Sequence, residues 1–500
     1  MSDSQSPSSM SVLHDAVVPI EMLLATVAKV LCSAVFVSGR DPEEAFRHSA
    51  LWALKAQLLP DAFSRHARWQ VDRADARVDI TVDFTRVAAA DLIAVHRAAH
   101  PGFEADWAGE TARLVSLGSV TRSAQFTGDQ GSIIVPRDGD RRLHFEPCPV
   151  RRGPASSAGW PGQTGAEPGD EASRRTRAGI AKALDDAFAD PEAFHAAVVV
   201  VHGGQIVGER YANGIGPDMP LESWSMGKSV MGTLIGLLVG RGALELDARA
   251  PIAAWDTPGD PRRAITLRHL LNMSSGLRCT GQDDARGTWR YGVPEHFLPY
   301  CEALNVAEYA TGRPLEFPPD TVGRYRNCDP LSLATIFHDT VRDRLGGNPL
   351  TWPQIQLFDK LGMRGLVLET DRWGHFIVSG FDYGTARDWA RIGLLYLRDG
   401  MWEGKRVLPA GWAAFARAPA PAWKNREYGA QMWLNSMNEL ALPPDTFYFA
   451  GGGGQYVLVV PSADLVIVRM GFTRGWEGAK AKVNTMLKGV TAALAKKATR

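Results

Sequence analysis

The chain has 500 residues, of which 45% are hydrophobic and 22% charged, a composition typical of a folded globular protein with more than one structural unit. Its 55 basic and 55 acidic side chains give a formal net charge of zero, so charge favours neither a nucleic acid nor an anionic membrane surface as partner. The five cysteines are far apart and form no C-x-x-C pair, which argues against a disulfide framework and a zinc site.

The N-terminal part, residues 1–150, is predicted to be an accessory region with helices and strands. It begins with MSDSQSPSSM, which lacks the positive segment of a secretory signal, so we expect the protein in the cytoplasm. The apolar stretch 17–37 is interrupted by Glu21 and Lys29. Because a spanning helix needs about 20 residues with few or no charges, we expect a buried or docked helix, with a membrane anchor as the alternative.

The rest of the accessory region predicts strands and one further helical piece. Residues 69–85 alternate apolar and polar side chains, the period of half-buried strands. A helical pattern follows at 88–99, and short strands are predicted at 119–127 and 131–138. No catalytic constellation occurs here, so the region is expected to pack against the rest of the chain or to shape the rim of a cleft.

Residues 151–173 are rich in Gly, Pro, Ser and charge, which predicts a linker and a domain boundary. The second unit, 174–500, opens with an amphipathic helix at 177–190. The stretch AAVVVVHGGQIVGERYANG then predicts a β-hairpin that turns at Gly203 and Gly204.

The segment SWSMGKSVMGTLIGLLVG, residues 223–240, predicts a helix with Ser225 in its first turn. Lys228 follows Ser225 by three residues, so both side chains fall on one face of that helix. A buried, neutral amine can remove the proton of a serine hydroxyl, and a helix N-terminus offers free N–H groups to a developing oxyanion. The spacing S-x-x-K is therefore a candidate for acyl transfer to serine, although alone it also fits an exposed serine and lysine on a surface helix.

Several further segments follow this motif in a recognisable order. They are ITLRHLLNMSSGL (265–277), YRN (325–327), GTARDWARIGLLYLRDGMWEGKRVLP (384–409), YGAQMWLN (428–435) and FAGGGGQYVLVVPSADLVIVRMG (449–471). Together with the S-x-x-K helix, they resemble the serine β-lactamase/penicillin-recognising superfamily, in its class C-like esterase and 6-aminohexanoate-dimer hydrolase branch. The resemblance covers about 175 to 495. It implies an α+β fold of the β-lactamase/transpeptidase type, with an antiparallel sheet flanked by helices, beside an all-helical part.

The resemblance also implies roles for particular residues. Ser225 would be the acyl-accepting nucleophile, Lys228 the group that takes its proton, and Tyr325 a group that passes protons to the leaving group. We expect the nearby lysine to lower the pKa of Tyr325. Asn327 would hydrogen-bond Lys228 and the acyl part of the substrate. No cofactor and no metal is required by this chemistry, and the expected partner is a small ester or amide.

The third motif departs from the family pattern. Aligning its glycine with Gly451 places Phe449 and Ala450 at the first two positions, and the family usually carries lysine or histidine at the first. Gly451 and Gly453 are both predicted on the strand of this motif. Since phenylalanine cannot bind a carboxylate, a β-lactamase or D-aminopeptidase activity is disfavoured. The backbone N–H groups of Ser225 and Gly452 are the expected oxyanion hole. A flexible hairpin turn is the alternative interpretation of these glycines.

The function implied is hydrolysis of small esters or amides through a Ser225 acyl-enzyme, including amides of the 6-aminohexanoate-oligomer type. The alternative from another class is a catalytically idle binding protein of the same fold. In the loop 278–293, Asp283 and Asp284 are expected to be solvated, and Trp289 and Tyr291 are assigned no role. The sequence leaves the oligomeric state open.

Overall fold

The computed structural model describes most of the chain, including the whole segment that surrounds the S-x-x-K motif. The described residues are 20–51, 66–93, 107–151, 160, 171–281, 283–284, 293–473 and 476–495. Most of the predicted linker, as well as Trp289 and Tyr291, lies outside these ranges.

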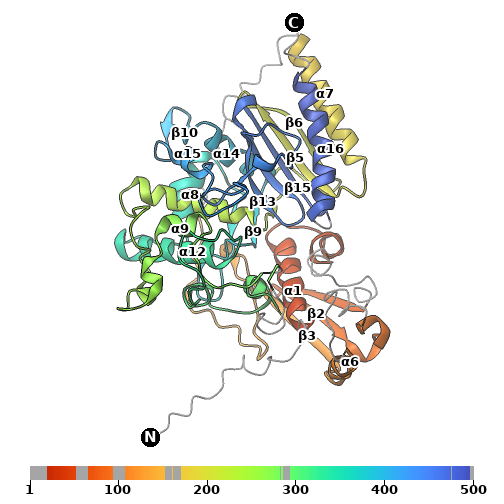
Figure 1. Ribbon diagram of the computed structural model, residues 1–500. Helices are drawn as coiled ribbons and strands as arrows, with labels where there is room; N and C mark the ends of the chain where they lie inside the picture. The colour runs from red at the N-terminus through yellow and green to blue at the C-terminus, as the bar shows by residue number, and fades with distance from the viewer. Residues whose placement is uncertain are drawn as a thin grey trace.

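A six-stranded antiparallel sheet forms the centre of the second unit, in the order β12-β13-β14-β15-β5-β6. Its strands are β5 (His195–His202), β6 (Gln205–Tyr211), β12 (Trp433–Leu434), β13 (Phe447–Gly451), β14 (Gln455–Val460) and β15 (Leu465–Gly471). Helices α7 (Glu171–Phe188) and α16 (Trp476–Ala495) lie together over one face of this sheet (Figure 1). The valine run of β5 serves both faces, because Val198 and Val200 join the core under these helices while Val199 and Val201 join the core on the other side.

The other face of the sheet contacts the helical half of the molecule (Figure 1). The main helices here are α8 (Met226–Gly240), α9 (Leu267–Leu271), α12 (Cys328–Asp339) and α14 (Ala386–Leu397). Shorter helices are α10 (Leu298–Cys301), α11 (Val306–Thr311), α13 (Asp359–Leu361) and α15 (Trp412–Ala416). Short strands are β7 (Leu221–Glu222), β8 (Val367–Leu368), β9 (Asp382–Gly384), β10 (Met401–Trp402) and β11 (Lys405–Arg406). Helix α8 is buried from Met226 to Leu238, as expected of a helix that is apolar nearly all round.

The N-terminal region contains a second antiparallel sheet in the order β1-β2-β3-β4. Its strands are β1 (Ala67–Asp72), β2 (Arg77–Asp83), β3 (Ser119–Phe126) and β4 (Ser132–Ile134), close to the predicted positions. Helix α1 (Ile20–Phe36) packs on this sheet, and the region also contains α2 (Pro42–Ala45) and α6 (Trp107–Ser116). Residues 89–93, within the helical pattern predicted at 88–99, are helical as well. Asp41 caps α2 by accepting from the backbone N–H groups of Glu43 and Glu44.

Helix α1 lies in the interior of the protein. Its apolar side chains share one hydrophobic cluster with β2 and β3 and with residues of the second unit, among them Leu298, Tyr300 and Phe381. Within the described ranges, no helix is both long and apolar enough to span a bilayer. The buried helix expected at 17–37 is therefore present from Ile20 onward, and the two units share a core across the predicted boundary.

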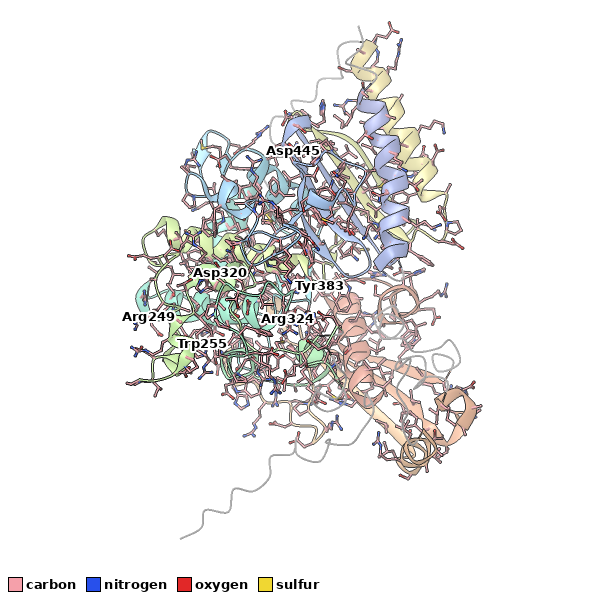
Figure 2. The ribbon with its side chains drawn as sticks, viewed as in Figure 1. Arg249, Trp255, Asp320, Arg324, Tyr383 and Asp445 are labelled. Atoms are coloured by element: carbon pink, nitrogen blue, oxygen red, sulfur yellow. The ribbon has the colours of Figure 1, made fainter. Side chains whose placement is uncertain are left out.

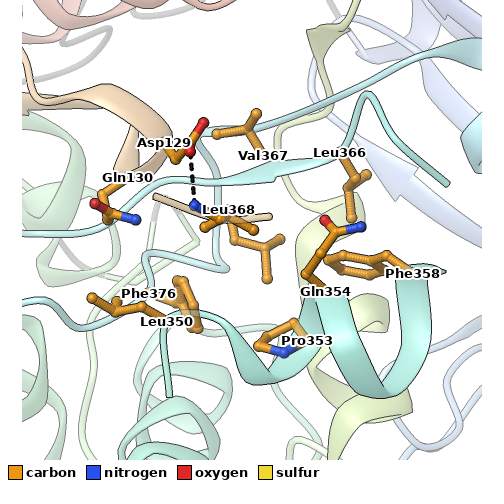
Figure 3. Close-up of a pocket in the computed structure, with 11 residues that line it drawn as sticks. Asp129, Gln130, Leu350, Pro353, Gln354, Phe358, Leu366, Val367, Leu368 and Phe376 are labelled. Atoms are coloured by element: carbon orange, nitrogen blue, oxygen red, sulfur yellow. Dashed lines mark hydrogen bonds between the residues drawn. The ribbon is translucent and has the colours of Figure 1, made fainter. Parts of the chain in front are cut away.

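A second contact between the units encloses only a small cavity (Figure 3). It lies between Gln130 and Asp129 on one side and Phe358 and Phe376 on the other. The Val150 N–H donates to Asp129 Oδ2 at 2.8 Å beside it. Its volume of about 20 Å³ holds one water molecule. This contact is a packing interface and has no room for a substrate.

Candidate functional site

Ser225 lies at the N-cap of α8, directly after the short strand β7. The preceding Trp224 has φ +50°, a left-handed conformation that is strained for a bulky residue. Its neighbour Ser223 donates from both N–H (2.8 Å) and Oγ (2.9 Å) to the carbonyl of Asp382. These contacts hold the chain in a sharp turn that places Ser225 at the start of the buried helix. The Ser225 side chain stays partly exposed there.

The structure brings Lys228 next to Ser225, with Nζ 2.8 Å from Oγ. Lys228 also donates to the backbone carbonyl of Ser379 at 2.9 Å, and Ser225 Oγ donates to the same carbonyl at 3.2 Å. Burial lowers the pKa of Lys228 well below its usual value, and the nearby Asp382 carboxyl only partly opposes this shift. A neutral amine within hydrogen-bond reach of a serine hydroxyl is the arrangement that general-base catalysis needs.

Tyr325 lies on the other side of Lys228, whose Nζ is 4.7 Å from the centre of the tyrosine ring. Burial raises the pKa of Tyr325 above its ordinary value, and a hydrogen bond with Ser225 opposes that shift. The expectation that this pKa is lowered was therefore wrong, because the effect of burial outweighs the opposing contacts. A phenol with a raised pKa stays protonated, so Tyr325 is suited to donate a proton.

Asn327 contacts His296 and Tyr300 through its side chain. Its Nδ2 donates to the hydroxyl of Tyr300 at 2.8 Å and to the carbonyl of His296 at 2.5 Å. Tyr300 in turn donates to the Ser379 carbonyl at 2.5 Å. The expected hydrogen bond between Asn327 and Lys228 is absent from the described contacts: the amide nitrogen is engaged by Tyr300 and His296, and the amide oxygen, which could accept from Lys228, has no partner among the described residues. Asn327 therefore orients Tyr300, which the sequence did not single out.

The third-motif segment ends beside the nucleophile turn. A Cβ on Gly451, the last residue of β13, would lie 2.0 Å from the carbonyl oxygen of Ser223, so only glycine allows this approach. Gly453, predicted on the strand, lies in the following turn with φ +82°. The ring of Phe449 is fully buried and packs against Tyr396, 5.8 Å between ring centres.

The turn after Gly451 is held by a buried arginine. Arg469 donates to the carbonyls of Gly453 (2.5 Å) and Gly454 (2.9 Å), and also to the carbonyl of Ala193 (2.7 Å). Burial lowers the pKa of Arg469 to about 9. Hydrogen bonds from one fully buried guanidinium to several carbonyls hold the backbone in place. This finding weighs against interpreting the glycines as a flexible hairpin turn.

The loop after SSGL is tied to both neighbours of Tyr325. Arg326 Nη2 donates to Asp283 at 2.9 Å and to Asp284 at 3.0 Å, and Arg324 also pairs with Asp284. Arg324 lies near the centre of the view in Figure 2. The two aspartates were expected to be solvated. Asp283 is solvated as expected, with its side chain 70% exposed, whereas that of Asp284 is 22% exposed. Both connect the loop to the segment that carries Tyr325.

Comparison with known proteins agrees with this geometry. The family model described as Beta-lactamase matches residues 180–487. The chain belongs to the Beta-lactamase family. Among curated proteins, this Beta-lactamase family chain is 25% identical over 314 residues to a 6-aminohexanoate-dimer hydrolase from Paenarthrobacter ureafaciens, covering 56% of this chain and 75% of the relative.

Solved structures support the same fold for this Beta-lactamase family member. A putative 6-aminohexanoate-dimer hydrolase from Bacillus anthracis superposes with a TM-score of 0.51 at 23% identity, covering 63% of this chain and 82% of that one. A family VIII carboxylesterase superposes with a TM-score of 0.50 at 13% identity, covering 65% and 98%. The predicted superfamily and α+β fold are thereby confirmed. Several relatives and structural neighbours are hydrolases by name.

Three groups of the site were not predicted from the sequence. The Ser379 carbonyl is a backbone atom, so no side-chain pattern could have identified it. Tyr300 carries no motif, and only its aromatic neighbourhood in the chain, HFLPYC, hinted at burial. Asp382 is fully buried beside Lys228, and within the described residues neither of its carboxyl oxygens has a hydrogen-bond partner.

Proposed function

We propose that this protein is a serine hydrolase that cleaves small ester or amide bonds through an acyl-enzyme on Ser225. The observation that carries the proposal is the 2.8 Å separation between Lys228 Nζ and Ser225 Oγ, with the amine buried and its pKa lowered. A surface serine and lysine would not share a buried acceptor such as the Ser379 carbonyl. The family membership gives independent support for hydrolase chemistry.

The proposed reaction has two stages. Lys228 takes the proton of Ser225 while Oγ attacks the carbonyl carbon of the substrate and forms a tetrahedral oxyanion. The N–H groups of Ser225 and Gly452 are proposed to stabilise this oxyanion, and the close approach of Gly451 to the nucleophile turn supports that role. Tyr325 then gives its proton to the departing alcohol or amine and recovers one from Lys228. Water, deprotonated by the same base, attacks the acyl carbon and releases the acid with free Ser225.

The substrate proposed is a neutral ester or linear amide. Phe449 is buried in the core, so this position of the third motif supplies no cation for a substrate carboxylate. Aromatic rings surround the nucleophile instead: Trp224 packs against Tyr300, and Tyr325 packs against Trp433 at 5.1 Å between ring centres. Similarity to a 6-aminohexanoate-dimer hydrolase supports the amide half of the proposal. Esters need less protonation of the leaving group, so we expect them to be cleaved faster.

The test is p-nitrophenyl ester turnover combined with intact mass after treatment with a fluorophosphonate. We expect the wild type to turn over and to gain one adduct, and Ser225→Ala to do neither. Ser436→Ala, which alters an exposed serine on the surface, is the matched control and should behave as the wild type. Amides, including 6-aminohexanoate dimers, then separate amidase from esterase, and nitrocefin should not be cleaved.

The competing function is that of a catalytically idle binding protein. It predicts that wild type and Ser225→Ala are equally inert and unlabelled. Retention of Ser225, Lys228 and Tyr325 in contact with one another argues against it, because an idle site has no chemical need for a buried neutral amine.

A further inference from the structure

The segments that build the site are attached to the N-terminal region by buried polar contacts. Glu222, three residues before Ser225, accepts from Arg40 Nη1 at 3.3 Å. The backbone carbonyl of Tyr300 accepts from Thr26 Oγ1 at 2.8 Å. The donors, Arg40 and Thr26, lie outside residues 180–487, which is the extent of the family match. The N-terminal region therefore touches the site through its own residues.

The strongest of these contacts is made by Glu369. Lys29 Nζ of α1 lies 2.8 Å from Glu369 Oε2, and both side chains are buried. Ser33 Oγ (2.7 Å) and the Ser132 N–H (2.9 Å) donate to Glu369 Oε1. A Cβ on Gly131 would lie 2.4 Å from Glu369 Cγ, so the backbone of the N-terminal region is pressed against this side chain. Donors on both oxygens and an opposite charge fix the carboxylate in one position.

Glu369 holds the loop that ends at β9. Its N–H donates to the carbonyl of Phe381 at 3.3 Å, and its carbonyl accepts from the Ile377 N–H at 2.9 Å. Between these two residues lies Ser379, whose carbonyl accepts from Ser225, Lys228 and Tyr300 as described above. Lys29 Nζ also lies 4.6 Å from the centre of the Phe381 ring. The position of the Ser379 carbonyl is thus linked to Lys29 through bonds and contacts on both sides of the loop.

We propose that Lys29 is a positioning residue of the catalytic site, whose ion pair with Glu369 fixes the loop that presents the Ser379 carbonyl to Ser225 and Lys228. The inference rests on the proposed acyl-enzyme function. It gives the N-terminal region a task in the reaction, beyond covering a hydrophobic face. A shift of the Ser379 carbonyl would rotate both the attacking hydroxyl and its base away from the substrate carbon.

The test compares kcat and KM for p-nitrophenyl ester turnover in Lys29→Met and in the double variant Lys29→Met/Glu369→Gln. Lys29→Met leaves a buried carboxylate without its counter-ion, and we expect kcat to fall roughly 10- to 100-fold with KM nearly unchanged. The double variant removes both charges and keeps an amide oxygen for Ser33 and Ser132, so most of the lost kcat should return. Arg137→Gln is the matched control, because it breaks an exposed link to Glu302 and should leave kcat unchanged.

Ser33→Ala is the milder variant, used because an unpaired Glu369 can unfold the chain. It removes one donor to Glu369, and we expect a several-fold slower fluorophosphonate labelling at an unchanged melting temperature. Equal kcat in wild type, Lys29→Met and Ser33→Ala would overturn the inference, as would a loss of kcat that the double variant does not recover. Failure of the proposed function is distinguishable, since the wild type itself would then be neither active nor labelled.

Discussion

Lys228 and Tyr325 divide the acid and base work because burial acts oppositely on an amine and a phenol. Removing water disfavours the charged form of each group, which lowers the pKa of Lys228 and raises that of Tyr325. Burial therefore favours the uncharged form of both groups, of which the amine can accept a proton and the phenol can give one. The low polarity of the site thus prepares both groups without a third charged residue.

The pH dependence follows from the neutral Lys228. Since only the unprotonated amine accepts a proton, kcat/KM should rise with pH through the lowered pKa of Lys228, at values well below 10.5. Below that pKa the amine is protonated and activity is lost. The measurement is a pH–rate profile for ester turnover. The profile of Lys228→Ala should lack the ascending limb, and that of the control Lys182→Ala, on the exposed face of α7, should keep it. A limb unchanged in Lys228→Ala would contradict this assignment.

The two tyrosines of the site should differ in their contribution. Tyr325 is partly exposed toward the nucleophile, whereas Tyr300 is buried with its hydroxyl held between Ser379 and Asn327. Tyr325→Phe should lower kcat by about 10²- to 10⁴-fold, the usual contribution of a proton-transfer group. Tyr300→Phe makes the same chemical change but removes only the two hydrogen bonds that position the hydroxyl, and it should lower kcat by about 5- to 10-fold. Steady-state kinetics of both variants measures the two losses of kcat. A larger loss in Tyr300→Phe than in Tyr325→Phe would assign proton transfer to Tyr300.

At the scale of an element, helix α8 is the part of the site that the local sequence predicted best. Its apolar run and the S-x-x-K spacing predicted both the helix and the pairing of Ser225 with Lys228. The valine run of β5 likewise predicted a strand. The Ser379 carbonyl, by contrast, approaches α8 from more than 150 positions away in the chain. Its place depends on the packing of Gly380 and Phe381, which no periodic pattern encodes.

Gly227, between Ser225 and Lys228 in the first turn of α8, is required by packing. A Cβ there would lie 1.6 Å from Asp382 Oδ2 and 2.8 Å from the carbonyl of Val378. Gly227→Ala should therefore lower the free energy of unfolding by about 1–3 kcal/mol and slow fluorophosphonate labelling, because the carboxyl or the helix must move. Gly216→Ala, where a Cβ meets nothing within 4 Å, is the matched control and should change stability by less than about 0.5 kcal/mol. Urea denaturation measures both, and equal stability of the two variants would refute the packing argument.

Arg469 gives the corresponding prediction for the Gly-rich turn. Arg469→Met leaves the carbonyls of Gly453, Gly454 and Ala193 without this donor inside the protein. The Gly453 carbonyl keeps the Thr473 N–H and the Ala193 carbonyl keeps Thr473 Oγ1, so only the Gly454 carbonyl is orphaned among the described contacts. An orphaned acceptor costs about 1–3 kcal/mol, and we expect the free energy of unfolding to fall by that amount. The exposed Arg417→Met should have little effect. Denaturant titration tests this, and a wild-type midpoint for Arg469→Met would restore the flexible-turn interpretation.

At the scale of the whole molecule, the main hydrophobic cluster of the second unit contains no described residue of 1–150, but another cluster crosses the predicted division at 151–173. Helix α1 contributes Leu24, Val27 and Leu31 to a cluster that also contains Tyr300 and Phe381 of the second unit. Composition revealed the Gly- and Pro-rich stretch. It could not reveal that an apolar helix before that stretch shares a hydrophobic cluster with side chains of the part after it, because such a contact is long-range.

A shared core predicts a single cooperative unfolding transition. We expect scanning calorimetry of the intact chain to show one transition, and thermal loss of fluorophosphonate labelling to coincide with it. Leu31→Ala, which truncates a fully buried side chain of α1, should lower the stability of the whole molecule by about 2–5 kcal/mol and shift both readouts together. Leu117→Ala, at a position where the side chain is 42% exposed, is the matched control and should shift neither. Two resolved transitions, with labelling unaffected by Leu31→Ala, would instead show that the N-terminal region unfolds independently and that the site does not depend on it.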